Sequence, residues 1–80
     1  MKEKKYKGKS NISGDRIREA RTDAKISQET LAARLQNMEI WLNQSAICEI
    51  EKGKQIVADY ELVAFAKILG KTVAWLVGEE

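Results

Sequence analysis

Three polar side chains, Gln44, Ser45 and Glu49, lie close together in a segment of helical character. Because residues four apart share a helix face, Glu49 lies one turn beyond Ser45. A carboxamide can bond an adenine in bidentate fashion, a hydroxyl is a flexible donor or acceptor, and a carboxylate can accept from a cytosine amino group. These residue types therefore indicate the reading of base edges in a DNA groove. For Glu49 a solvated helix face is the alternative.

Covalent chemistry has little support in this sequence. Cys48 is the single cysteine, and the chain has no histidine that could act as its base. One cysteine cannot form an internal disulfide, and no Cys/His cluster is present to hold zinc. There is also no glycine-rich phosphate loop. We therefore expect no enzyme activity, no cofactor and no metal site, and we interpret Cys48 as a small, partly buried residue.

Two short amphipathic helices must position the polar residues. Ser27 can cap the first helix through its hydroxyl, and Asn43 can cap the second in the same way. Gly53 can adopt the left-handed conformation that ends a helix, so the second helix spans residues 43–52. The apolar stripes of the two helices comprise Leu31, Ala32 and Leu35, and Ala46, Ile47 and Ile50. A packed helix followed by one with a polar outer face is typical of a helix-turn-helix DNA reader.

Three further helices complete an all-α prediction. They cover residues 13–25, 58–69 and 73–77, with Gly70 ending the fourth helix and Thr72 capping the fifth. The fifth helix holds more apolar groups, including Trp75, than one short helix can bury, so its surplus is a candidate dimer patch. No period-two alternation is sustained, which argues against a sheet. The sequence predicts one compact five-helix domain over residues 13–78.

Positive charge is concentrated at the N-terminus. The formal net charge is +2, yet five lysines lie in the first nine residues, and residues 10–80 hold nine basic and eleven acidic residues. Residues 1–12 have little to bury and are predicted to be a disordered tail, either solvated or an arm that adds phosphate contacts. No apolar run approaches the roughly 20 residues that cross a bilayer, and no signal peptide is present. We expect a cytoplasmic protein without membrane contact.

The connector at residues 36–42 is unusually rich in large apolar residues. Ile40 and Leu42 have the spacing of two residues that face the core from an extended segment. Trp41 would then point elsewhere. We expect Trp41 to be a partly buried packing residue, and a surface anchor for a partner chain is the alternative.

Four sequence blocks, in this order and spacing, carry a resemblance to a known family. They are RIREAR at 16–21, SQETLA at 27–32, ICEIEKGK at 47–54 and LxxxAxxLG at 62–70. These blocks resemble the lambda-repressor/Cro-like (XRE, Cro/C1-type) helix-turn-helix transcriptional regulators. The resemblance covers roughly residues 13–78. It implies a five-helix fold whose second and third helices form the helix-turn-helix, and proteins that bind operator DNA, commonly as dimers.

Several side chains are candidates for phosphate contacts, assigned from helix starts and flanking cations, with the role of Gln28 implied by the resemblance. Gln28 would clamp a phosphate at the start of the second helix, where free amides and the helix dipole help. Lys52 and Lys54 follow the reading helix and can hold the DNA backbone beside the groove. Arg16 and Lys25 are weaker phosphate candidates.

The family often pairs an arginine and a glutamate at the positions of Arg21 and Glu51. We therefore predict a largely buried ion pair that joins the first and third helices. The connector is longer than in typical members, and members with a long connector usually carry glycine where Glu39 stands. The domain is also less basic than typical members.

These features favour a sequence-specific DNA-binding transcriptional regulator, acting as a repressor on double-stranded DNA as a homodimer. The alternative is an antitoxin or a protein-interaction module on the same fold that binds a protein partner. The acidic body, Trp41 and the apolar segment around Trp75 motivate this alternative.

Overall fold

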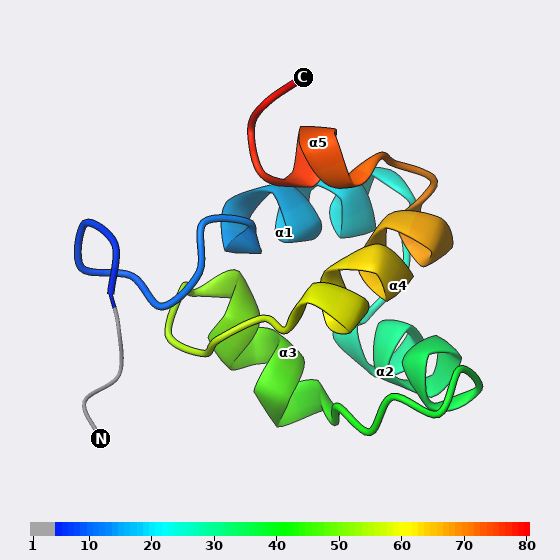
Figure 1. Ribbon diagram of the computed structural model, residues 1–80. Helices are drawn as coiled ribbons and strands as arrows, with labels where there is room; N and C mark the ends of the chain where they lie inside the picture. Colours follow the sequence, from blue (N-terminus) through cyan, green and yellow to red (C-terminus); the bar gives the residue numbers. More distant parts are fainter. Residues whose placement is uncertain (1–4) are drawn as a thin grey trace.

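The structure, a computed structural model, describes residues 5–80 and is helical throughout that range apart from turns and one isolated bridge between Tyr6 and Lys9. Its helices are α1 Gly14–Asp23, α2 Gln28–Gln36, α3 Gln44–Glu51, α4 Asp59–Leu69 and α5 Val73–Leu76. Figure 1 shows α1 between α5 above and α3 below. The all-α, five-helix prediction is confirmed.

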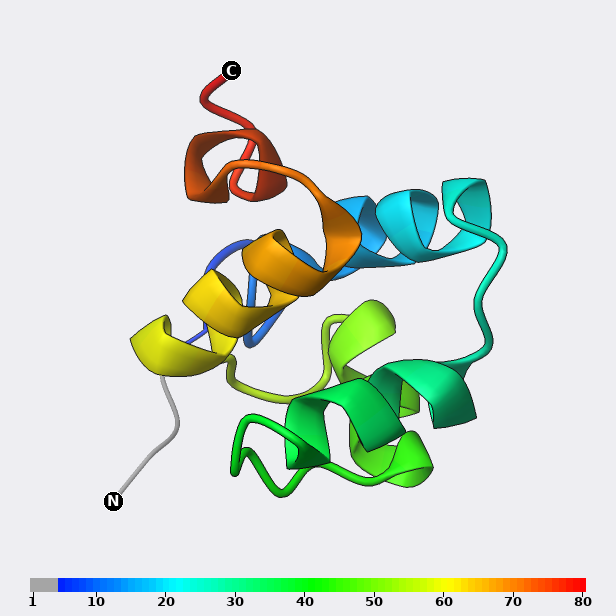
Figure 2. The same cartoon turned by 90° about the vertical axis from the view of Figure 1, so that its right-hand side faces the viewer.

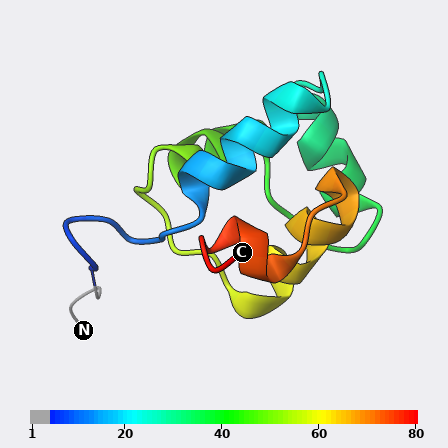
Figure 3. The same ribbon diagram turned by 90° about the horizontal axis from the view of Figure 1, so that it is seen from above.

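The helices surround one apolar core. Its fully buried side chains come from every helix: Ile17, Leu31, Leu35, Ile47, Ile50, Phe65 and Leu76. Burying each such side chain stabilises the fold by about 1.5–3 kcal/mol. In Figure 2, α2 and α3 lie together at one end of the molecule and α5 lies at the other. Figure 3 looks down on α5, which packs on both α1 and α4.

Local capping signals set most of the helix boundaries. The Ser27 hydroxyl accepts from Thr30 N at 3.0 Å, the Asn43 side chain from Ala46 N at 2.9 Å, and Thr72 Oγ1 from Trp75 N at 3.0 Å. These are the three caps predicted from the sequence. Gly53 and Gly70 have φ values of 76° and 68°, the left-handed conformation predicted for both.

Two predicted boundaries are wrong by one or two residues. Helix α1 ends at Asp23 rather than near Lys25, because Lys25 adopts a left-handed conformation with φ of 60° that no helix can continue. Helix α5 ends at Leu76 rather than at Val77.

The N-terminal segment packs on the domain, contrary to the prediction of a disordered tail. Ser10 N donates to the Gly53 carbonyl at 2.8 Å. The Asn11 carboxamide donates to the carbonyl oxygens of Ile50 (3.0 Å) and Gln55 (2.8 Å) and accepts from Gly14 N (2.8 Å). The prediction is therefore wrong for Ser10 and Asn11, while residues 1–4 lie outside the described residues.

The connector between α2 and α3 corrects the expectation for Trp41. Leu42 is buried and Ile40 packs against the core, as predicted. Because these two residues take the inward positions of an extended segment, Trp41 points outward and is 76% exposed. Trp41 is therefore not a partly buried packing residue.

Candidate nucleic-acid interface

The outer face of α3 is open to solvent. Gln44 and Ser45 are exposed in its first turn, Cys48 and Glu49 are half-buried, and Lys52 at the C-cap is exposed. Lys52 Nζ lies 3.9 Å from Glu49 Oε1, with both side chains about half exposed. The three predicted reading residues therefore share one accessible surface of α3, the helix at the lower edge of the molecule in Figure 1.

The opposite face of α3 is anchored firmly. Ile47 and Ile50 are fully buried in the core. At the C-terminal end of α3, the Ile50 carbonyl accepts from Asn11, and its oxygen lies so close to Gly14 that any β-carbon there would collide with it. α1 and α3 can approach this closely only because residue 14 is glycine, so the orientation of α3 depends on that position.

A bidentate ion pair joins α1 to the end of α3. Arg21 Nε donates to Glu51 Oε2 at 2.7 Å and Arg21 Nη2 to Glu51 Oε1 at 3.0 Å. The side chains are 13% and 3% exposed, so the structure contains the largely buried pair that the sequence predicts. A further bond runs from Arg21 Nη1 to the Ile26 carbonyl at 2.9 Å. The hydrogen bond to Glu51 raises the pKa of the Arg21 guanidinium, so this group stays charged wherever the protein is folded.

Gln28 extends this pair to the first residue of the reading helix. Its Nε2 donates to Glu51 Oε1 at 3.0 Å, and its Oε1 accepts from Gln44 Nε2 at 2.6 Å. A carboxamide nitrogen carries two hydrogens, so both Gln28 and Gln44 keep one N–H for another partner. The chain Arg21–Glu51–Gln28–Gln44 thus links α1, α2 and α3 and fixes the direction of the Gln44 amide.

A hollow of about 210 Å³ lies beside this chain of hydrogen bonds. It is lined by Arg18, Arg21, Gln28, Cys48, Glu51 and Lys52. Arg18 on α1 and Lys52 at the end of α3 are exposed cations that both line the hollow. Two positive charges and a free amide hydrogen form a suitable environment for an anion such as a phosphate.

Arg18 was not predicted from the sequence to be a site residue. A signal was present, since Arg18 lies three residues before Arg21 and so shares its helix face.

Comparison with known proteins decides the family. A helix-turn-helix family profile (HTH_3) matches residues 17–76. The chain belongs to this helix-turn-helix family. No curated protein sequence matches it significantly. The structure is similar to that of the P22 c2 repressor protein in complex with synthetic operator 9T in the presence of Tl⁺, with a TM-score of 0.73 and 24% identity over 88% of this chain and 98% of that chain.

At that level of identity the likeness establishes the fold. The lambda-repressor-like, Cro/C1-type fold inferred from the four sequence blocks is confirmed. In this helix-turn-helix, α2 and α3 are the two paired helices and residues 37–43 form the turn. Glu39 has φ of 62°, the left-handed conformation that explains why glycine is usual there.

Other predicted phosphate ligands of this helix-turn-helix domain are less well placed. The Arg16 guanidinium lies over the Trp75 ring, 4.6 Å from its centroid, and Lys71 Nζ lies equally close to the same ring. Arg16 is therefore held against α5, which lies on the other side of α1 from α3 in Figure 1. Lys54 is exposed just after α3, and Lys25 is exposed in the turn between α1 and α2.

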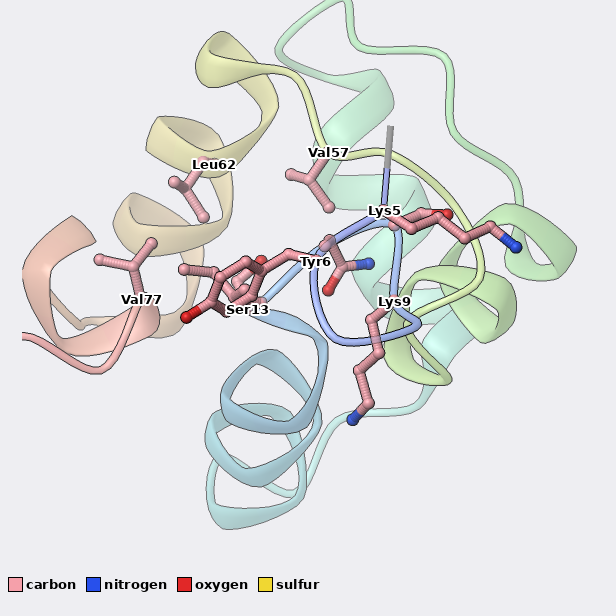
Figure 4. Close-up of a pocket in the computed structure, with 10 residues that line it drawn as sticks. Lys5, Tyr6, Lys9, Ser13, Val57, Leu62 and Val77 are labelled. Atoms are coloured by element: carbon pink, nitrogen blue, oxygen red, sulfur yellow. The ribbon is translucent and has the colours of Figure 1, made fainter. Parts of the chain in front are cut away.

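A second hollow, of about 330 Å³, lies between the N-terminal segment and the α4–α5 side of the domain (Figure 4). The side chains of Val57, Leu62 and Val77 form its apolar wall. In Figure 4 the ammonium groups of Lys5 and Lys9 point away from these apolar groups, and Lys9 Nζ lies 3.5 Å from Asp15. Polar residues line the hollow as well, among them Asn11, whose carboxamide is already bonded to the Ile50 and Gln55 carbonyls.

Two further findings concern membrane-spanning helices and metal sites. Each helix of residues 5–80 is too short or too polar to cross a membrane. Within the same range, no three carboxylate or thiol side chains gather closely enough to hold a metal ion.

Proposed function

We propose that this chain is a sequence-specific DNA-binding transcriptional regulator, acting as a repressor, that reads the major groove of double-stranded DNA with helix 43–52. The outer face of α3 carries the proposal. Gln44 and Ser45 are exposed at the N-terminal end of a helix whose other face is anchored by Ile47 and Ile50. Residues at that end of a recognition helix are the ones that reach base edges.

Gln44 is the main reading residue in this proposal. After donating one hydrogen to Gln28, its carboxamide retains one N–H and its carbonyl oxygen. Those two groups match N7 and the N6 amino group of adenine. Because Gln28 holds the amide in one orientation, less side-chain entropy is lost when the base is bound.

Ser45 and Glu49 supply the remaining reading positions. The Ser45 hydroxyl can donate to or accept from any base edge. Glu49 can accept from a cytosine amino group, and Lys52 beside it reduces the repulsion between that carboxylate and the phosphates. We assign Glu49 to discrimination between bases rather than to affinity.

Phosphates are bound around the hollow between α1 and α3 in this proposal. The second amide hydrogen of Gln28 donates to a phosphate at the N-terminus of α2, where the helix dipole adds to the attraction. Arg18 and Lys52 flank that position, and Lys54 lies just beyond. We leave Arg16 out of this set because its guanidinium is occupied by Trp75.

A homodimer completes the proposal. Val73 is 36% exposed on α5, and its neighbours Ala74 and Val77 are half-buried. Packing of α5 against a second copy would bury this surface and place two reading helices on a two-fold symmetric operator. Size-exclusion chromatography with light scattering tests it, and a monomer at all concentrations, with or without DNA, would contradict it.

Fluorescence anisotropy with labelled genomic fragments, including the chain's own promoter region, tests DNA binding across a salt series from about 50 to 200 mM. We expect affinity to fall steeply with salt. Arg18→Ala and Lys52→Ala should each weaken binding to all sequences and reduce the salt slope by about 1. Lys67→Ala, an exposed lysine on α4, is the matched control and should leave the slope unchanged. Wild-type protein without salt-sensitive binding would contradict the proposal.

A second function is favoured by charge. Residues 10–80 carry a net charge of −2, which is unusual for a DNA-binding domain. On that account the fold is an antitoxin or protein-interaction module, and a pull-down retaining a protein partner but no DNA would support it.

A further inference from the structure

Trp41 is the most exposed of the large apolar side chains in residues 5–80, at 76%. Large aromatic side chains dominate binding energy where they are buried at interfaces. A tryptophan left in water at a fixed position on a small domain therefore indicates a surface on which a partner docks.

The backbone around Trp41 is held in place. Met38 N and Ile40 N both donate to the Leu35 carbonyl, at 2.9 and 3.0 Å, and Glu39 N donates to the Gln36 carbonyl at 2.9 Å. Leu42 on the other side is buried in the core. The outward position of the indole is thus fixed by the residues on both sides of it.

The position of Trp41 close to Gln44 in the chain favours DNA as the partner. Trp41 precedes Gln44 by three residues, so their Cα atoms are at most about 10 Å apart. The major groove is about 12 Å wide. When Gln44 lies in the groove, Trp41 lies within about one groove width of it, so the sugar–phosphate backbone that borders the groove is the nearest partner for its outward side chain.

We propose that Trp41 is a DNA-backbone contact that extends the recognition surface beyond α3. Its indole N–H donates to a phosphate oxygen, and its ring packs on the adjoining deoxyribose. This inference rests on the proposed function. It assigns to Trp41 a contribution to affinity for all sequences, since the backbone carries no direct base code.

DNA affinity at one fixed salt concentration, measured with the duplex that wild type binds best, tests this contact. Trp41→Ala should weaken binding about 5- to 10-fold, the range expected for one hydrogen bond with adjoining packing. Trp41→Phe keeps a ring and loses the N–H, so its affinity for the duplex should lie between those of wild type and Trp41→Ala. Tyr60→Ala is the matched control, because Tyr60 is 62% exposed on α4, and it should bind as wild type does.

Two additional readouts separate this contact from other roles. The salt slope of Trp41→Ala should equal that of wild type, because indole carries no charge. Indole emission of wild type should change on adding DNA, and that change should be absent in Trp41→Phe. If wild type binds DNA and Trp41→Ala binds equally well, the inference is overturned and the proposed function stands. If wild type binds no DNA, the proposed function itself fails.

Discussion

Removing the carboxylate of Glu51 should destabilise the domain severely. Glu51 accepts three hydrogen bonds, from Arg21 Nε, Arg21 Nη2 and Gln28 Nε2, at 2.7, 3.0 and 3.0 Å. In Glu51→Ala the Arg21 guanidinium keeps one bond, to the Ile26 carbonyl, while its side chain is only 13% exposed. Breaking a buried pair in this way costs about 3–5 kcal/mol.

That loss is large compared with the total stability. A domain of 80 residues is typically stable by about 4–12 kcal/mol. Each kcal/mol shifts the Tm of a domain this size by roughly 4–8 °C, so Glu51→Ala should lower the Tm by at least about 12 °C. An arginine guanidinium stays protonated in proteins, so Arg21 does not escape the penalty by losing its proton.

Urea denaturation followed by circular dichroism measures the change in the free energy of unfolding. A double variant, Arg21→Met with Glu51→Leu, should recover most of the loss, because it removes both charges together. Lys52→Ala breaks the exposed pair with Glu49 and serves as the control, with an expected change below about 0.5 kcal/mol. If the free energy of unfolding of Glu51→Ala lies within about 1 kcal/mol of the wild-type value, or if the double variant is as unstable as Glu51→Ala, the buried pair does not stabilise the domain as expected.

Four further substitutions, one of them a control, test the backbone that supports the reading helix. Glu39→Gly should raise the free energy of unfolding by about 0.5–1 kcal/mol, because φ of 62° strains any residue with a β-carbon, whereas Asn37→Gly at φ of −63° should lower it. Gly14→Ala should cost about 1–3 kcal/mol, since its methyl group collides with the Ile50 carbonyl; a thermal melt like that of wild type would show that α1 and α3 separate freely. Asn11→Ala removes the donor to the Gln55 carbonyl and one of two donors to the Ile50 carbonyl, which keeps its bond from Gly53 N. It should cost about 1–3 kcal/mol by chemical denaturation, an effect that a disordered tail would not produce.

Features that depend only on short stretches of sequence were predictable. The caps at Ser27, Asn43 and Thr72 and the helix end at Gly70 depend on bonds or backbone angles within three or four residues. The core stripes follow from helical spacing alone. The exposed face of α3 could be predicted in the same way, because it lies opposite the buried stripe that contains Ile47.

Apart from the Arg21–Glu51 pair, which the family resemblance predicted, features that depend on distant contacts were not predictable from the sequence. Asn11 is fixed by carbonyls about 40 residues away, at Ile50 and Gln55, so Ser10 and Asn11 join the domain although they were predicted to belong to a disordered tail. Arg16 was assigned to DNA because it is a cation on α1, and only the packing of α5 reveals its place over Trp75.

Trp41 shows a different limit. Alternation correctly predicted that Ile40 and Leu42 face the core and that Trp41 points elsewhere, but it does not say how much of an outward side chain neighbouring elements cover. The size and hydrophobicity of the indole favoured burial, and the two smaller side chains occupy the core instead.

The proposed function requires that the first turn of α3 reads base pairs. A selection of bound sequences from random duplexes, run with wild type and with Gln44→Ala, tests it most directly. We predict that wild type enriches one sequence and that Gln44→Ala loses the preference for adenine at one position of each half-site while preferences elsewhere persist. Enrichment of no sequence by wild type, or identical preferences for the two proteins, would contradict the assignment.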